Sequence, residues 1–178
     1  MHVDGYRVRS VTTEDAPDVQ ALLELDPESF ELLEGAPLRP DEALEVITEL
    51  PPGVPPERKY NFLLEPEAPA PGQPGGAAAL LSLVEGFPDD GTWYLGLIIV
   101  APAARGQGLG TRAIEALCAH ARERGGTALR LAVVPTNTGA RRLYDRLGFG
   151  FVARRLRESR TGVLGAVDVL ERRLGQLG

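Results

Sequence analysis

A glycine-rich stretch, residues 101–113, holds the residue types of this chain best suited to binding a charged ligand. It reads Ala-Pro-Ala-Ala-Arg-Gly-Gln-Gly-Leu-Gly-Thr-Arg-Ala, so that glycines alternate with other residues directly after Arg105. Glycines let an anion approach main-chain N–H groups without a Cβ in the way, and a helix N-terminus adds unpaired N–H groups and the positive end of the helix dipole. Arg105 and Arg112 add positive charge. The stretch therefore predicts a phosphate-binding turn between a strand and a helix.

Three nucleotide-binding patterns compete for this turn. A P-loop is excluded because it needs a lysine after its last glycine, and Lys59 is the only lysine of the chain. A dinucleotide-binding pattern, Gly-x-Gly-x-x-Ala, fits residues 108–113, but the next strand ends in Val-Val-Pro without the carboxylate that would hold a ribose. The third pattern, Arg/Gln-x-x-Gly-x-Gly/Ala, fits at every position from Arg105 to Gly110.

A second motif lies about thirty residues further along the chain. Asn137 begins an Asn-x-x-Ala sequence, which is followed by Leu143-Tyr144 and then by Leu-Gly-Phe at residues 147–149. Together the two motifs, within residues 92–154, resemble the GNAT superfamily of acyl-CoA-dependent N-acyltransferases in order and spacing. The resemblance implies an N-acetyltransferase that moves an acetyl group from acetyl-CoA, as co-substrate, to a primary amine that attacks the thioester directly.

The resemblance also assigns roles to particular residues. The pantetheine arm of the cofactor is expected to lie along the central strand, residues 92–100, and Asn137 to hydrogen-bond it. The pyrophosphate is expected on the glycine-rich turn. The implied cofactor-binding residues are Ile98, Ile99, Val100, Arg105, Gly106, Gln107, Gly108, Leu109, Gly110, Thr111 and Asn137. Tyr144 matches the phenol that relatives place near the sulfur, as a general acid; a core aromatic on an amphipathic helix is the other interpretation.

The general base is less clear, because relatives often carry a glutamate in the central strand and residues 92–100 contain no carboxylate. Glu85, on the adjoining strand, is the candidate that we select; a chain of waters with no single base is the alternative. No cluster of residues suggests a metal site. The missing carboxylate also leaves a second function open, a non-catalytic acyl-CoA-binding module on the same scaffold.

The elements that position these residues follow from apolar periodicity and from turn residues. The order predicts one domain over residues 1–178, with a GNAT-like mixed, mostly antiparallel central sheet flanked by helices on both faces. Expected strands are residues 6–11, 60–64, 77–85, 92–100, 128–134, 151–157 and 162–173. Expected helices follow Thr12, run over 40–50 and 109–124, and extend from the N-cap Asn137 to Gly148. Residues 66–76, rich in proline and glycine, predict a mobile hairpin loop.

Charge is distributed unevenly along a chain whose net charge is −6. Residues 1–90 carry a net −14 and residues 91–178 a net +8. The resemblance implies that the first two helices and the loop between them wall the acceptor site, and here that stretch contains Glu24, Asp26, Glu28, Glu31, Glu34, Asp41, Glu42 and Glu45. These acids predict either a field that attracts a cationic small molecule or peptide amine, or simply a soluble surface. The overall acidity argues against nucleic acid as a partner.

The remaining features concern the compartment and the core. One cysteine, Cys118, cannot form an internal disulfide, and no segment reads as a signal peptide or a membrane span, so we expect a cytoplasmic protein with no membrane partner. Apart from acetyl-CoA and the amine, a second copy of the chain in a homodimer is the only partner left open. His120 falls on the apolar face of its helix and is expected to be a core residue.

Overall fold

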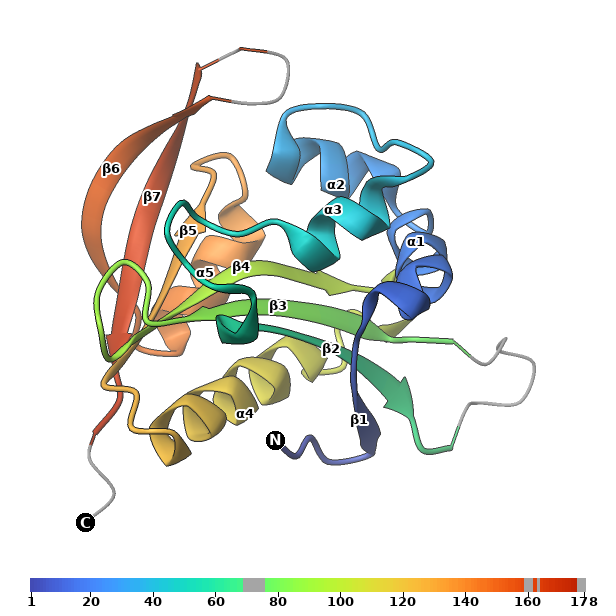
Figure 1. Cartoon of the computed structure of the whole chain (residues 1–178), viewed down its shortest axis with the longest axis horizontal. Helices are drawn as coiled ribbons and strands as arrows, with labels where there is room; N and C mark the ends of the chain where they lie inside the picture. Colours follow the sequence, from blue (N-terminus) through green and yellow to red (C-terminus); the bar gives the residue numbers. More distant parts are fainter. Residues whose placement is uncertain (69–75, 159–161, 163, 176–178) are drawn as a thin grey trace.

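A seven-stranded sheet is the framework of the computed structural model, which describes residues 1–68, 76–158, 162 and 164–175 (Figure 1). The strands lie in the order β1-β2-β3-β4-β5-β7-β6. Their bounds are β1 Tyr6–Ser10, β2 Lys59–Pro66, β3 Ala79–Glu85, β4 Thr92–Val100, β5 Ala128–Val133, β6 Gly150–Glu158 and β7 Leu164–Arg173. All neighbours pair antiparallel except β4 and β5, so the expected mostly antiparallel sheet is confirmed.

The parallel pair β4–β5 is short and then opens. Four residue pairs join the two strands, and the last of them is Leu95 with Leu131. Beyond Leu95, β4 continues to Val100 and still pairs with β3, but no longer with β5. The edge of β4 that faces β5 therefore carries peptide groups without a sheet partner over its second half.

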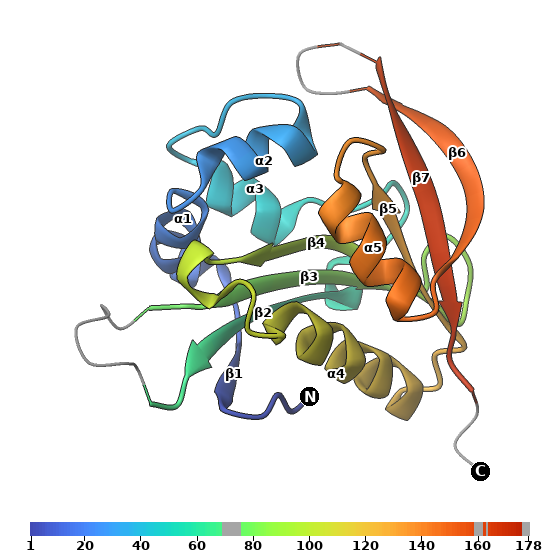
Figure 2. The same cartoon turned by 180° about the vertical axis from the view of Figure 1, so that it is seen from behind.

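Helices cover both faces of the sheet (Figures 1 and 2). On one face, α1, α2 and α3 pack over the central strands around a core that includes Leu63, Leu80 and Leu97. On the other face, α4 and the residues of α5 pack on a larger core that includes Leu81, Leu95 and Leu131. The bounds are α1 Ala16–Leu23, α2 Pro27–Glu34, α3 Glu42–Thr48, α4 Leu109–Glu123 and α5 Thr138–Arg146; three 3₁₀ turns lie at Thr13–Asp15, Pro56–Arg58 and Pro102–Ala104.

A β-bulge at Gly96 decides which side chains of β4 face which core. The register with β3 shifts there, because Leu95 pairs with Leu83 while Leu97 pairs with Ser82. Leu95 consequently belongs to the core under α4, whereas Leu97 belongs to the core under α1–α3. Without the bulge these two side chains would point to the same face.

The expected strands and four of the five helices are confirmed within one or two residues at most ends, which is the usual spread of such boundaries. The helix α2 was missed, although Asp26-Pro27 is a good start signal and Gly35, at φ +70°, a good stop. Most of the loop expected at residues 66–76 lies outside the described residues. Among the helices that are described, none is long and apolar enough to cross a membrane.

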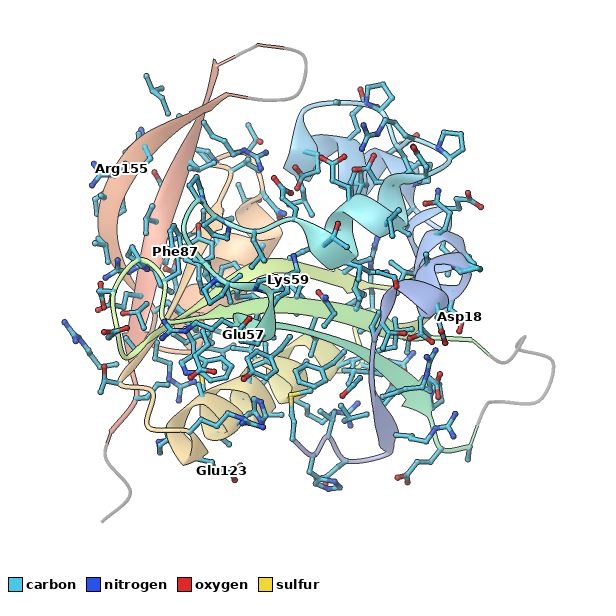
Figure 3. The ribbon with its side chains drawn as sticks, viewed as in Figure 1. Asp18, Glu57, Lys59, Phe87, Glu123 and Arg155 are labelled. Carbon is cyan, nitrogen blue, oxygen red and sulfur yellow. The ribbon has the colours of Figure 1, made fainter. Side chains whose placement is uncertain are left out.

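The one lysine of the chain lies at the start of β2. The Lys59 ammonium donates a hydrogen bond to the carbonyl oxygen of Glu49, and burial lowers its pKa (Figure 3). The side chain thereby ties the end of the α3 segment to the sheet.

Candidate active site

A cleft of about 1080 Å³ opens where β4 and β5 separate. Its lining residues come from β4, the glycine-rich turn, the start of α4, α5, the end of α2 and the β6–β7 pair. Of the residues expected to hold the cofactor, the structure brings together in this cleft Ile98, Ile99, Val100, Arg105, Gly106, Gly108, Leu109, Gly110, Thr111 and Asn137. Gln107 is the exception: it lies outside the lining and donates from its side-chain amide to the carbonyl oxygen of Ala103.

The glycine-rich turn has the shape that an anion site needs. Gly106 and Gly108 adopt φ values of +73° and +76°, which L side chains rarely adopt, and a Cβ at either position would meet nothing within 4 Å. Gly108 is the N-cap of α4, so the N–H groups of Leu109, Gly110 and Thr111 have no acceptor within the helix. Helix N–H groups and open space therefore meet at the cleft, as binding of a pyrophosphate requires.

The two arginines expected to add charge here are both engaged elsewhere. Arg105 donates from Nε to the carbonyl oxygen of Val100 at 2.9 Å, and its Nη1 lies 2.6 Å from Oδ2 of Asp26. The guanidinium of Arg112 lies over the ring of Tyr6, 5.5 Å from its centroid. Main-chain N–H groups, rather than guanidinium groups, are thus the donors that the turn presents.

Asn137 and Tyr144 reach the cleft from the N-terminal part and the middle of α5. Asn137 is the N-cap, and its Oδ1 accepts a hydrogen bond from the N–H of Ala140 at 3.1 Å. This bond fixes the oxygen and leaves the Nδ2 group as a donor for a ligand in the cleft. The Asn-x-x-Ala spacing therefore serves both the helix and the site.

Tyr144 is 5% exposed, and its ring packs against Phe149 with centroids 5.6 Å apart. Burial raises the pKa of Tyr144 to about 12. Its hydroxyl has no hydrogen-bond partner among the described residues, although the residue lines the cleft. The phenol is accordingly protonated at neutral pH and available as a donor.

The structure does not bring Glu85 to this cleft. Its Oε2 accepts a hydrogen bond from the Tyr60 hydroxyl at 2.8 Å, and it lines a separate small pocket with Arg124 and Gly125. That pocket lies by the C-terminal end of α4, marked by Glu123 in Figure 3, whereas the glycine-rich turn lies at the other end of this 15-residue helix, about 22 Å away at 1.5 Å per residue. Glu85 pairs with Trp93 of β4 and is not among the residues that line the cleft, so its role as the base stays a prediction that this geometry does not support.

The acidic wall expected at the acceptor site is also absent in the form that we expected. Of the eight acids in that stretch, only Glu34 lines the cleft. Asp26 is paired with Arg105, while Asp41, Glu42 and Glu45 share Arg39. Apart from Glu34, the acids of this stretch therefore do not line the cleft as the expected wall.

One end of the cleft holds residues to which the sequence interpretation gave no role of their own: it named Glu34 only among the acids of the expected wall, and it did not name Arg157. Glu34, at the end of α2, forms an ion pair with Arg157 of β6 at 3.4 Å, and Arg157 also donates to the carbonyl oxygen of Leu33. Tyr94 of β4 lines the same end, with its ring 5.5 Å from that of Phe87. Burial raises the pKa of Tyr94, while the positive charges of Arg157 and Arg130 oppose the shift.

Sequence comparison identifies the family to which this architecture belongs. The Acetyltransferase (GNAT) family matches residues 20–149, and the chain is a member of that family. It is similar to a thialysine N-epsilon-acetyltransferase of Bos taurus, with 36% identity over 94 residues. That match spans 50% of this chain and 55% of the bovine protein, so the chain matches about half the length of this relative.

Solved structures show the same fold along nearly the whole chain. An acetyltransferase from Thermus thermophilus superimposes with a TM-score of 0.71 and 24% identity, covering 98% of this chain and 100% of the other. The ribosomal-protein-S18-alanine N-acetyltransferase of Escherichia coli gives 0.68 and 23%, covering 97% and 96%. A Salmonella typhimurium protein, classed provisionally as an acetyltransferase and solved with its cofactor acetyl-CoA, gives 0.63 and 18%, covering 98% and 97%.

Proposed function

We propose that this protein is an N-acetyltransferase that transfers the acetyl group of acetyl-CoA to a primary amine. The observation that carries the proposal is the cleft itself, in which a pyrophosphate-binding helix N-terminus, the unpaired edge of β4 and the Tyr144 phenol lie along one continuous channel. Acetyl-CoA supplies the acyl thioester on which the reaction depends. Membership of the GNAT family and the similarity to an amine acetyltransferase support the same conclusion.

The residues present fit this co-substrate part by part. The N–H groups at the start of α4 would hold the pyrophosphate, and the N–H and C=O groups along the β5-facing edge of β4 would pair with the amides of the pantetheine arm. The Nδ2 group of Asn137 would donate to that arm. The carbonyl of Val100 already accepts a hydrogen bond from Arg105, so Ile98 is better placed than Val100 for a main-chain contact with the arm.

Tyr144 is proposed to donate its hydroxyl hydrogen toward the departing sulfur. A phenol with a pKa of about 12 is a weaker acid than an ordinary thiol, whose pKa is about 8.5, so complete transfer to a thiolate alone is unfavourable. Tyr144 is therefore best suited to stabilise the sulfur by a hydrogen bond, while the ammonium that forms on the attacking amine supplies the proton for the thiol. Overall, one amine and one thioester are converted into one amide and one thiol.

The base stays open in this proposal, because the cleft presents Glu34 and Tyr94 but no carboxylate on β4. That observation also favours the second candidate, an acyl-CoA-binding module without catalysis. The decisive experiment measures release of free thiol from acetyl-CoA across a panel of amines, together with coenzyme A binding. Thiol release that depends on the amine supports the enzyme, and binding without release supports the module.

We propose the cytoplasm as the compartment. The one cysteine of the chain, Cys118, is buried, burial raises its pKa to about 11, and it has no second cysteine with which to form an internal disulfide.

A further inference from the structure

The acceptor end of the cleft presents two opposite charges side by side. Glu34 reaches it from α2 and Arg157 from β6, with 3.4 Å between Oε2 and Nη1. Figure 1 shows the upper ends of β6 and β7 across from α2, and the bond from Arg157 to the carbonyl oxygen of Leu33 joins the two segments. The Glu34 and Arg157 side chains are 30% and 40% exposed, so both charges remain accessible to a ligand.

The surfaces around this pair are apolar. Leu32, Leu33, Leu156, Val167 and Val169 line the cleft next to it. Leu32 and Leu156 are 46% and 72% exposed, so their side chains are open to a molecule that enters the cleft. The acceptor end thus offers an aliphatic channel that ends at a guanidinium–carboxylate pair.

Arginines outnumber acids in the lining of the cleft. Within the described residues, its charged lining consists of Glu34, Arg146, Arg155, Arg157 and Arg105, of which Arg105 is paired with Asp26. Such a lining disfavours an acceptor that carries only positive charges, and a guanidinium binds a carboxylate through two parallel hydrogen bonds.

We propose that the Glu34–Arg157 pair binds a zwitterionic head group on the acceptor, with the acceptor carboxylate on Arg157 and its second ammonium on Glu34. The acceptor class is then an amino acid whose reacting amine stands at the end of an aliphatic side chain. This inference rests on the proposed acetyltransferase function and assigns Arg157 and Glu34 as specificity-determining residues.

Three amines with the same aliphatic chain test the proposal: lysine, ε-aminocaproate, which lacks the second ammonium, and cadaverine, which lacks the carboxylate. We expect kcat/KM, measured by thiol release, to be highest for lysine and at least about tenfold lower for cadaverine, a difference of about one charge-assisted hydrogen bond. Arg157→Gln is expected to lower kcat/KM for lysine at least about tenfold and to bring the ratio of lysine to cadaverine to one or below, because the carboxylate of lysine loses its partner while Glu34 still attracts the second ammonium of cadaverine. Glu34→Gln is expected to remove the advantage of lysine over ε-aminocaproate.

Arg154→Gln is the matched control, because Arg154 lies on the same strand but pairs with Asp168 at 2.7 Å, outside the cleft. It should keep the wild-type ratio of lysine to cadaverine. Since Arg157 also ties β6 to α2, the thermal midpoint of each variant is recorded, and Arg157→Lys, which keeps the charge but not the two parallel bonds, should retain part of the preference.

Calorimetric binding of lysine and cadaverine in the presence of coenzyme A distinguishes a failure of the head-group site from a failure of the proposed acetyltransferase function. Lysine binding that is lost in Arg157→Gln, without any thiol release, would support the head-group site and overturn the acetyltransferase. Thiol release and binding as good with cadaverine as with lysine would overturn the head-group site and leave the acetyltransferase standing.

Discussion

Asp26 and Arg105 join the first turn of α2 to the first residue of the cofactor turn. Oδ2 of Asp26 lies 2.6 Å from Nη1 of Arg105, while Oδ1 of the same carboxylate accepts from the N–H of Ser29 and caps α2. The hydrogen bonds from Ser29, and then Arg105, hold the pKa of Asp26 below its usual value. One carboxylate therefore connects the start of α2 with the glycine-rich turn.

Asp26→Asn is expected to tighten coenzyme A binding about two- to fivefold, because it removes a negative charge beside the phosphate site and frees Arg105. The asparagine oxygen keeps the α2 cap, so the thermal midpoint should change little. Asp18→Asn is the control: it removes the same charge from α1, in contact with Arg9 and away from the cleft (Figure 3). Binding weakened by Asp26→Asn, measured by calorimetry at low and high salt, would mean instead that the pair holds the turn in its binding shape.

Gly108→Val is expected to abolish measurable coenzyme A binding, because the branched side chain would stand in the open space at the start of α4. Gly125→Val is its matched control. Gly125, at φ +81° with nothing within 4 Å, lies at the other end of α4 and carries the same backbone penalty of about 1–2 kcal/mol per residue. Both variants should lose similar stability in urea, and only the first should lose cofactor affinity; equal affinities would refute the position of the phosphate site.

Tyr144→Phe is expected to lower kcat by about 10²-fold or more with little change in coenzyme A affinity, the pattern of a lost general acid or sulfur hydrogen bond. Its stability should hold, since the hydroxyl has no partner to lose among the described residues. Because the pKa of Tyr144 is raised to about 12, the wild-type rate profile should show no loss from this group up to about pH 10. A wild-type kcat in the phenylalanine variant would make Tyr144 a packing residue.

Glu85→Gln should leave kcat and the KM values within about twofold of wild type, since this carboxylate faces Tyr60 and lies outside the cleft. The comparison with Glu34→Gln, under the same assay, distinguishes the two acids. A large loss of kcat in Glu85→Gln would restore the residue to the reaction.

His120 should make stability depend on pH. It is 6% exposed among Tyr60, Phe62 and Trp93, and its Nε2 lies 3.1 Å from Nε of Arg124, from which it accepts a hydrogen bond when neutral. Burial, followed by Arg124, lowers its pKa from 6.5, so the unfolded chain takes up a proton before the folded one does.

The stability from this group is therefore complete above pH 6.5 and is lost as the pH falls through the lower folded pKa. The urea midpoint of the wild type should fall between pH 7.5 and pH 5 by more than that of His120→Phe. His2→Gln, which changes an exposed ring beside Asp4, should keep the wild-type slope. Parallel slopes in the wild type and His120→Phe would contradict the assignment.

The two motifs could be read from the sequence because local rules determine them. The glycines that need positive φ and the cap at Asn137 depend on residues only a few positions away. Features that depend on contacts between segments distant in the sequence could not be predicted in this way. The bulge at Gly96 depends on pairing with β3, and the pairing of Arg105 with Asp26 joins residues that only the folded sheet brings together.

The two expectations about acids had different grounds. The placement of Glu85 on the strand beside β4 is confirmed, since Glu85 pairs with Trp93, but adjacency of two strands does not say which end of the sheet a residue occupies. The acids of residues 24–45 were placed beside the acceptor by the family resemblance, and Glu34 was named only as one of them because the α2 helix that presents it was missed. Its partner Arg157 comes from the far end of the chain.

Lys59, at the start of β2, is the only side chain of the protein that an amine-acylating reaction can modify. Apart from the α-amino terminus, it is the only aliphatic primary amine of the chain, and its ammonium is already hydrogen-bonded and half-buried. The acetyltransferase activity that we propose would therefore find only one side-chain amine to modify on the chain itself. Mass spectrometry after long incubation with acetyl-CoA should find few added acetyl groups, and amine-reactive dyes should label the protein at one or two defined points.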